Sequence, residues 1–301
     1  MLGGVLALLS SMMFAGNMTT LRRGVITAPV YQAIAITVPI GVPLFYMILV
    51  IFDYTYLLYT MSFDSLFFFS LAGIVHLIIG RYCNYKSTQL LGATLAGPVT
   101  QLGLLVSIFF AFFVLGEIIT LKLLIGISLI IIGPSIILFL GKENSKTKSG
   151  IIIDYKKGYI WGILCAISFG ISTYFVKVGL NEGGVKESIV GAFIAYFSAT
   201  ILIFLIIIIS KKSFREIYNY QKEGVSWFLL AGIFSFFAHL LRYMALGIAP
   251  ISIVEPIQKT TIIFRVIFSW FVNKKHEIIN FKVLFGIFLS IVGVYFIIWQ
   301  I

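Results

Sequence analysis

The chain has 301 residues, of which 60% are hydrophobic and 11% are charged, and its mean hydropathy is +1.08. Soluble domains carry about 25% charged residues, so this composition excludes an ordinary soluble protein and indicates an integral membrane protein. The formal net charge of +11 comes from basic residues in short segments beside apolar runs, where charge sets orientation and contacts anionic lipids. We therefore expect a lipid bilayer as a partner and no nucleic acid.

Ten membrane-spanning helices are predicted from the apolar runs between polar interruptions. A run such as "SIVGAFIAYFSATILIFLIIII" at residues 188–209 can cross a hydrocarbon core of ~30 Å, which takes about 20 helical residues. The runs are continuous and do not alternate with polar residues, so the sequence predicts an all-α fold and not a β-barrel. In chain order, the predicted spans cover residues 3–21, 30–52, 66–85, 89–115, 120–140, 158–178, 188–210, 226–246, 250–272 and 281–299.

The longest polar stretch divides the chain into two predicted halves. It covers residues 141–157, "GKENSKTKSGIIIDYKK", directly after the fifth predicted span. Its polar composition is typical of a linker, so residues 1–140 and 158–301 are predicted to be two five-helix units. Charges follow the first apolar run instead of preceding it, so we predict a membrane helix there and not a cleaved signal.

The two halves share an internal repeat, with matching residues 155 to 160 positions apart. Each half holds five predicted spans, an odd number, so the second half must enter the membrane from the opposite side. Such an inverted-topology repeat is typical of secondary transporters. The supporting matches are "LAGI" at 71–74 and 230–233, Gly126 with Gly286, Gly133 with Gly293, Glu117 with Glu277, Pro98 with Pro256 and, more loosely, residues 14–24 with 169–179.

The fourth and fifth predicted spans carry a pattern that resembles a known family. The segment "ATLAGPVTQLGLLVSIFFAFFVLGEIITLKLLIGISLIIIG" has Pro98 in one helix, a Gly116-Glu117 pair at its end and two glycines seven residues apart in the next. This pattern looks like the EamA domain of the drug/metabolite transporter superfamily. Residues 242–293 are similar to a second copy, in which His276-Glu277 replaces the Gly-Glu pair.

The resemblance covers nearly the whole chain and implies a ten-helix transporter with a cavity between its halves. A small polar metabolite, such as an amino acid or an organic anion, is the implied substrate, moved by alternating access. A carrier or flippase for a lipid-linked or nucleotide-sugar substrate is the alternative. Glu117 matches the family's motif glutamate, and we expect it to end its own helix and order the turn that follows.

Other function classes are less favoured by the residues themselves. There is no Gly-x-x-x-x-Gly-Lys-Ser/Thr loop for ATP, so a coupling proton or other ion is the candidate partner for any energy coupling. An intramembrane enzyme is not expected, because His-Glu-x-x-His and a nucleophile elbow are both missing. Only Cys83 and Cys165 occur, without motif spacing, so no metal site or cofactor is expected. A channel, and either a monomer or a homodimer, remain compatible with the sequence.

Lys259 lies at mid-bilayer depth in the predicted span 250–272. It is nine residues from Pro250 and fourteen from Asn273, which places it ~14 and ~21 Å from the two ends at 1.5 Å per residue. Its side chain cannot reach water along its own helix, so it needs a cavity, a partner or the loss of its proton. Glu255 precedes it by one turn and can pair with it. The alternative is an ion pair that only fixes helix packing.

The repeat marks the same depth in both halves. Gln101 follows Pro98 by three residues, as Lys259 follows Pro256. Each proline lacks an amide donor and clashes with the carbonyl four residues earlier, which loosens the helix there. Proline-interrupted spans at matching positions of inverted halves indicate a transport site near the midplane, although a proline kink without function is also tolerated in membranes.

Further candidates complete the predicted transport cavity. Arg265 is eight residues from Asn273, or ~12 Å, so it can either face the cavity or snorkel to the interface. Arg81 and Arg242 fall near span ends, where interface anchoring is expected. An intramembrane histidine or asparagine faces the bundle interior, as a relay, a binding group or a packing residue. The complete predicted cavity set is Asn17, His76, Gln101, His239, Glu255, Lys259 and Arg265, with helix breaks at Pro98 and Pro256.

The orientation implied by charge differs from the one implied by the family. Basic residues gather on the side away from both termini, and only Lys122, Lys177, Lys186 and Arg242 belong to the other side. By the positive-inside rule, the linker of this multi-pass protein of the cell membrane lies in the cytoplasm and both termini lie outside. The family resemblance implies termini inside. The basic residues on the linker side are Arg22, Arg23, Arg81, Lys86, the five lysines of 142–157, Lys211, Lys212, Arg215, Lys222, Lys274, Lys275 and Lys282.

The charge distribution predicts that epitope tags on both termini are accessible to antibody in intact cells. A tag in the linker should become accessible only after the cells are permeabilised, and it serves as the control. Terminal tags that stay protected until permeabilisation would contradict this orientation.

Overall fold

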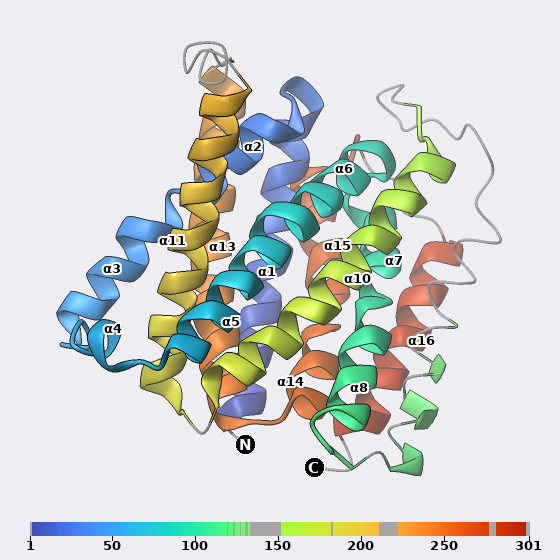
Figure 1. The fold of residues 1–301 in the computed structure, drawn as a ribbon. Coiled ribbons are helices and arrows are strands. Elements are labelled where there is room, and N and C mark those ends of the chain that lie inside the picture. Colours follow the sequence, from blue (N-terminus) through green and yellow to red (C-terminus); the bar gives the residue numbers. More distant parts are fainter. Residues whose placement is uncertain are drawn as a thin grey trace.

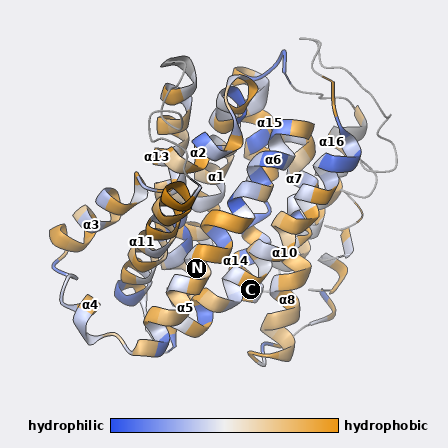
Figure 2. Ribbon diagram, turned by 45° about the horizontal axis from the view of Figure 1, so that its top comes forward, coloured by the Kyte–Doolittle hydropathy of each residue, from blue (hydrophilic) through white to orange (hydrophobic). Residues whose placement is uncertain are grey.

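The computed structural model describes residues 2–118, 152–181, 183–210, 222–276 and 281–298, together with 120–122, 124–126, 128, 129 and 132. The regular elements in this part of the chain are helices, so the all-α prediction is confirmed for it (Figure 1). Long hydrophobic side chains on the outer faces, such as Ile209, Phe113 and Phe271, are exposed. Figure 2 shows hydrophobic residues along most helices, whereas α6 (Arg81–Leu91) is largely hydrophilic.

Seven helices among the described residues are long and apolar enough to cross a bilayer, so a multi-pass membrane protein is confirmed. The ten predicted spans are not all confirmed, because three of them are not among these seven helices. Of the other three predicted spans, 120–140 lies largely outside the described residues, 250–272 is broken, and 281–299 corresponds to α16 (Phe281–Ile298). The seven helices are Leu2–Thr27, Val30–Ile51, Phe63–Leu91, Ala93–Phe113, Tyr155–Leu180, Val185–Ile209 and Gly224–Ile248.

Three predicted spans are interrupted near their prolines: 30–52, 250–272 and, as described below, 89–115. Span 30–52 divides into α2 (Val30–Thr37) and α3 (Gly41–Ile51), because Pro39 in the turn between them has no amide hydrogen. Span 250–272 divides into α14 (Ile251–Gln258) and α15 (Thr261–Val272). Each of these segments is too short to cross a bilayer alone, so α2 and α3 together form the one broken span Val30–Ile51.

The third and fourth spans meet at a different place from the one predicted. The third consists of α5 (Phe63–Gly73), the π-helical segment η1 (Ile74–Gly80) and α6, which continues to Leu91. The polar residues at 86–88 stay helical, and the chain turns at Gly92, whose φ is +89°. Glycine adopts this left-handed conformation without strain. The fourth span then follows as α7 (Ala93–Gln101) and α8 (Gly103–Phe113).

The first helix of each half packs against the third and fourth spans of the other half. In the first half α1 (Leu2–Thr27) contacts α13 (Lys222–Ile248), α14 and α15. In the second half α10 (Tyr155–Leu180) contacts α5, η1, α6, α7 and α8. In Figure 1 both helices run through the middle of the bundle, and α11 (Val185–Ile209) and the short α4 (Leu57–Thr60) lie to one side. This reciprocal packing is what an inverted repeat produces.

Close helix contacts depend on glycine at a few positions. Gly73 of α5 lies against the backbone of Ala195 in α11, where an added Cβ would come within 2.6 Å of the Ala195 Cα. A backbone atom cannot move aside as a side chain can. Small residues at membrane helix interfaces allow backbones to approach in this way, since lipid supplies no hydrophobic drive for association.

We predict that Gly73→Ala lowers the free energy of unfolding by ~1–3 kcal/mol, the usual cost of overpacking. The matched control is Gly224→Ala in α13, whose added Cβ would find Ala28 Cβ at 3.5 Å, an ordinary contact. That control should be neutral or slightly stabilising, because alanine favours helix over glycine by ~1 kcal/mol. Thermal unfolding in detergent measures both, and equal melting temperatures for the two variants would contradict the packing described.

Candidate transport site

A cavity lies at the centre of the bundle, where α1, α6, α7, α13, α14 and α15 meet. The centres of water molecules can occupy about 100 Å³ of it, and a single water needs roughly 10–15 Å³ on this measure. The space therefore suits a small molecule. The lining residues are Phe14, Asn17, Met18, His76, Arg81, Asn84, Gly97, Thr100, Gln101, Phe169, His239, Arg242, Glu255, Gln258, Lys259, Thr261, Ile262 and Arg265.

The two helix interruptions of the repeat meet at this cavity. Helix α7 ends at Gln101 and helix α14 ends one residue before Lys259. The Gln101 Nε2 donates a hydrogen bond of 2.7 Å to the Lys259 carbonyl oxygen. Helix α7 ends three residues after Pro98 and helix α14 ends two residues after Pro256, so neither break falls at Thr94 or Ser252, where the sequence placed the loosening. Each half thus contributes an interrupted helix to one central point.

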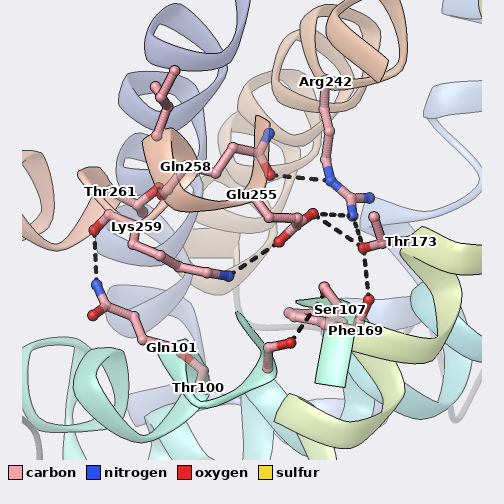
Figure 3. A network of polar contacts seen from close by, with 12 residues as sticks. Thr100, Gln101, Ser107, Phe169, Thr173, Arg242, Glu255, Gln258, Lys259 and Thr261 are labelled. Atoms are coloured by element: carbon pink, nitrogen blue, oxygen red, sulfur yellow. Dashed lines mark hydrogen bonds and ion pairs between the residues drawn. The ribbon is translucent and has the colours of Figure 1, made fainter. Parts of the chain in front are cut away.

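Glu255 is the centre of the charged network (Figure 3). Its Oε1 accepts from the Arg242 guanidinium at 2.8 Å and from the Thr173 hydroxyl at 3.0 Å. Its Oε2 accepts from the Lys259 ammonium at 3.2 Å. The predicted pair of Glu255 and Lys259 is present, and Arg242, which the sequence assigned to the interface, is a second partner. Glu255 is 4% exposed, so both of its oxygens are bound to cations inside the protein.

Arg242 links this carboxylate to the first helix. Its Nε donates to the Gln258 Oε1 at 3.1 Å, and the Gln258 Nε2 donates to the Ser10 hydroxyl at 3.0 Å. Ser10 in turn donates to the Ala238 carbonyl at 2.8 Å. The network therefore joins α13, α14 and α1, with Thr173 adding α10 (Figure 3). Arg242 is a buried part of the site and not an interface anchor.

Arg265 faces the cavity and is 5% exposed, so the snorkelling alternative is wrong. Its Nη1 donates to the Ala93 carbonyl at 3.3 Å. Gly97 allows this position, because a Cβ there would lie 3.0 Å from the Arg265 Nη1. The guanidinium of the second half therefore lies against the interrupted helix of the first half.

The two histidines and Asn17 lie along another wall of the cavity. The His76 ring stacks on Phe169 at 4.1 Å and its Nδ1 forms a 2.7 Å hydrogen bond with the Ser172 hydroxyl. His239 is 5.0 Å from the His76 ring, and its Nδ1 bonds the Ser235 carbonyl at 2.8 Å. The Asn17 amide donates to the Ala231 carbonyl. In the described part of the chain, no group of three or more His, Cys, Asp or Glu side chains could hold a metal ion.

Arg81 is a further buried cation that the sequence assigned to the interface. It is 4% exposed, and its guanidinium donates to the Thr37 carbonyl, the Tyr196 hydroxyl and the Ser235 hydroxyl at 3.3, 3.1 and 2.7 Å. It also lies over the Tyr196 ring, 5.6 Å from its centre. These three partners are neutral, so they accept hydrogen bonds from the guanidinium without compensating its positive charge.

Comparison with known proteins assigns the chain to a family. A model of the family described as "EamA-like transporter family" matches residues 1–139 and 156–299. The chain belongs to this family of membrane transporters. Solved structures include 29 matching chains. One crystal structure, described only as that of a protein, shares 14% identity, covers 99% of this chain and 96% of its own and has a TM-score of 0.66, so it shows the fold alone. No curated protein matches the sequence significantly.

The EamA-like repeat is asymmetric in charge around the cavity. Four charged positions of the second half correspond, at a constant shift of 158 residues, to neutral positions of the first half. Glu255 and Lys259, for example, correspond to Gly97 and Gln101. The charge that any ligand meets from these positions therefore belongs to the second half. The four correspondences are Asn84 with Arg242, Gly97 with Glu255, Gln101 with Lys259 and Ser107 with Arg265.

The sequence predicts that Glu117 ends its own helix and orders the turn that follows, whereas its carboxylate binds the start of a helix in the other half. Its two carboxylate oxygens accept from the Ile251 and Ser252 amides at 3.1 and 2.9 Å, so it caps the first turn of α14 in the other half. A carboxylate at a helix N-terminus satisfies unpaired amides and complements the helix dipole. Its expected partner, Glu277, lies outside the described residues.

Glu255→Gln should destabilise this EamA-like protein strongly, because two buried cations would lose their shared carboxylate. Removing one partner of a buried ion pair costs ~3–5 kcal/mol. The control is Asp154→Asn, whose 3.7 Å pair with Lys157 is exposed and is worth ~0–1 kcal/mol. Thermal unfolding in detergent compares the two. A loss no larger for Glu255→Gln than for Asp154→Asn would show that the network does not stabilise the fold.

Proposed function

We propose that this EamA-like transporter is a secondary carrier for a small anion, a carboxylate or phosphate compound, which it binds in the central cavity and moves by alternating access. The observation that carries the proposal is the charge of the cavity wall. Four cations, Arg81, Arg242, Lys259 and Arg265, line it in the described residues, against the single carboxylate of Glu255. A charge at mid-bilayer depth costs ~3 kcal/mol on insertion scales, so such an excess is expected where an anion is bound.

Lys259 is the cation best suited to exchange partners with the substrate. Glu255 uses one oxygen for Arg242 and Thr173 and the other for Lys259. If Lys259 turns toward a substrate anion, Glu255 still keeps Arg242 and is not left as an unpaired buried charge. Lys259 is also the more exposed cation of the two, with 14% of its side chain accessible against 4% for Arg242.

The small volume of the cavity favours a free metabolite over a lipid-linked one. About 100 Å³ of space for water centres holds a few waters or a small organic acid. Arg265 and Lys259 are placed to hold its charged group, because guanidinium and ammonium donors bind carboxylate and phosphate with charge-assisted hydrogen bonds. Gln101 and Asn17 would contact its neutral part.

The first experiment is a thermal-shift screen of the purified protein against free carboxylates, phosphate compounds, neutral sugars and nucleotide sugars. Ligands that bind only the folded protein raise its melting temperature. We expect anions to do so, and a response to nucleotide sugars alone would favour the alternative carrier class.

Lys259→Ala should abolish transport of the anion so identified while the protein stays folded. The control is Lys186→Ala, an exposed lysine that lies 5.7 Å from the Tyr54 ring and outside the cavity. Counterflow in proteoliposomes measures both, since exchange of labelled for unlabelled solute requires a carrier cycle. Unchanged counterflow in folded Lys259→Ala would remove Lys259 from the site, and flux without counterflow would indicate a channel.

A further inference from the structure

Two basic side chains occupy equivalent places at opposite ends of the bundle. Residues 14–24 align with residues 169–179 at a shift of 155, which pairs Arg22 of α1 with Lys177 of α10. Each cation binds backbone carbonyls at the end of the third span of its own half. Arg22 binds the Thr88 carbonyl, and Lys177 binds the Leu246 carbonyl, which corresponds to Thr88 at the shift of 158.

At one end Arg22 joins three segments and both halves. Its Nη1 donates to the Thr88 and Gln89 carbonyls, at 2.9 and 2.8 Å, at the C-terminus of α6. Its Nη2 donates at 3.2 Å to the carbonyl of His276, in the turn after α15. Arg22 is 1% exposed. Cations at a helix C-terminus satisfy its last carbonyls and complement its dipole.

Neighbouring contacts hold the same turn. The Arg23 Nη1 lies 2.8 Å from the His276 Nε2, and the Asn273 amide donates to the Thr19 carbonyl at 2.8 Å. Partial burial and the guanidiniums of Arg23 and Arg22 hold the pKa of His276 below its usual range, which favours the neutral ring that accepts from Arg23. The turn after α15 is thus tied to α1 by four side chains.

At the other end Lys177 and Glu117 hold the turn between α13 and α14. The Lys177 ammonium donates to the Leu246 and Ala249 carbonyls at 3.0 and 3.3 Å. Glu117, from the first half, accepts from the Ile251 and Ser252 amides on the far side of that turn. A cation and a carboxylate from different halves therefore fix the carbonyl end of one helix and the amide end of the next.

We propose that Arg22 and Lys177 are the paired latches of alternating access, each closing one end of the cavity. This inference rests on the proposed carrier function. Inverted halves exchange conformations during a cycle, so equivalent bonds at opposite ends break in turn. The Arg22 latch is the stronger one, because a guanidinium with three carbonyl partners replaces an ammonium with two.

Cysteine accessibility tests the latches without any substrate. The reporter is Thr261→Cys in the cavity wall, in a background where Cys83 and Cys165 are replaced by alanine. An anionic, membrane-impermeant methanethiosulfonate is applied to vesicles of either orientation, and the labelling rate is measured from each side. Orientation is assigned with a cysteine at exposed Lys156, which lies at the Arg22 end.

Arg22→Gln should raise labelling from the Arg22 end about tenfold, the effect of losing ~1.4 kcal/mol from the closed state. Lys177→Gln should raise labelling from the opposite end, and by less. Arg22→Lys keeps the charge but loses the planar fork, so it should give an intermediate rate, and it replaces Arg22→Gln if that variant does not fold. The charge controls Lys156→Gln and Lys186→Gln should change neither rate.

Two results would overturn the proposal. One is a rate unchanged in both latch variants, and the other is an increase from the same end in both. Since labelling requires no transport, either result leaves the anion-carrier proposal standing, and unchanged counterflow in Lys259→Ala, which would contradict that proposal, leaves the latches standing.

Discussion

The shared carboxylate of Glu255 is the interaction on which the central cavity depends. It is buried, and its two oxygens hold Arg242 and Lys259 in place from opposite sides. Without it, two cations would lie unneutralised at the depth where charge is most costly. With it, the protein keeps those cations inside the membrane and still leaves the more accessible one able to change partners. In the proposed function, an anion could therefore bind Lys259 while Glu255 keeps its ion pair with Arg242.

The depth argument from sequence found Lys259 and Glu255 but could not find Arg242. Distance along one helix decides whether a side chain can reach water, and Arg242 lies only six residues before the end of α13. The turn to α14 consists of Ala249 and Pro250, so Glu255 returns to nearly the same depth as Arg242 on the neighbouring helix. Cations close to a span end are therefore best read together with the first turns of the next span.

Arg265 illustrates a choice that sequence alone leaves open. Its distance from the helix end permits both snorkelling and an inward position. The decision comes from the facing helix, where Gly97 leaves room for the guanidinium and the Ala93 carbonyl accepts from it. The positions of the helix breaks were likewise only partly predictable from the sequence. Proline positions predicted which spans are interrupted, but not that the breaks fall at Leu102 and at Lys259–Thr260, where Gln101 donates to the Lys259 carbonyl.

The two repeats share the same helix arrangement but differ in the charge of the residues that line the cavity. Interrupted helices, reciprocal packing and end contacts recur in both halves, as expected for an inverted repeat. The charges at equivalent positions do not recur, because Asn84, Gly97, Gln101 and Ser107 are neutral where the second half has Arg242, Glu255, Lys259 and Arg265. Because equivalent positions of the two halves differ in charge, the two states of an inverted-repeat carrier are not expected to have equal energies. The proposed difference in strength between the Arg22 and Lys177 latches is an imbalance of the same kind, and in the proposed cycle the two together would determine which end the empty carrier keeps closed.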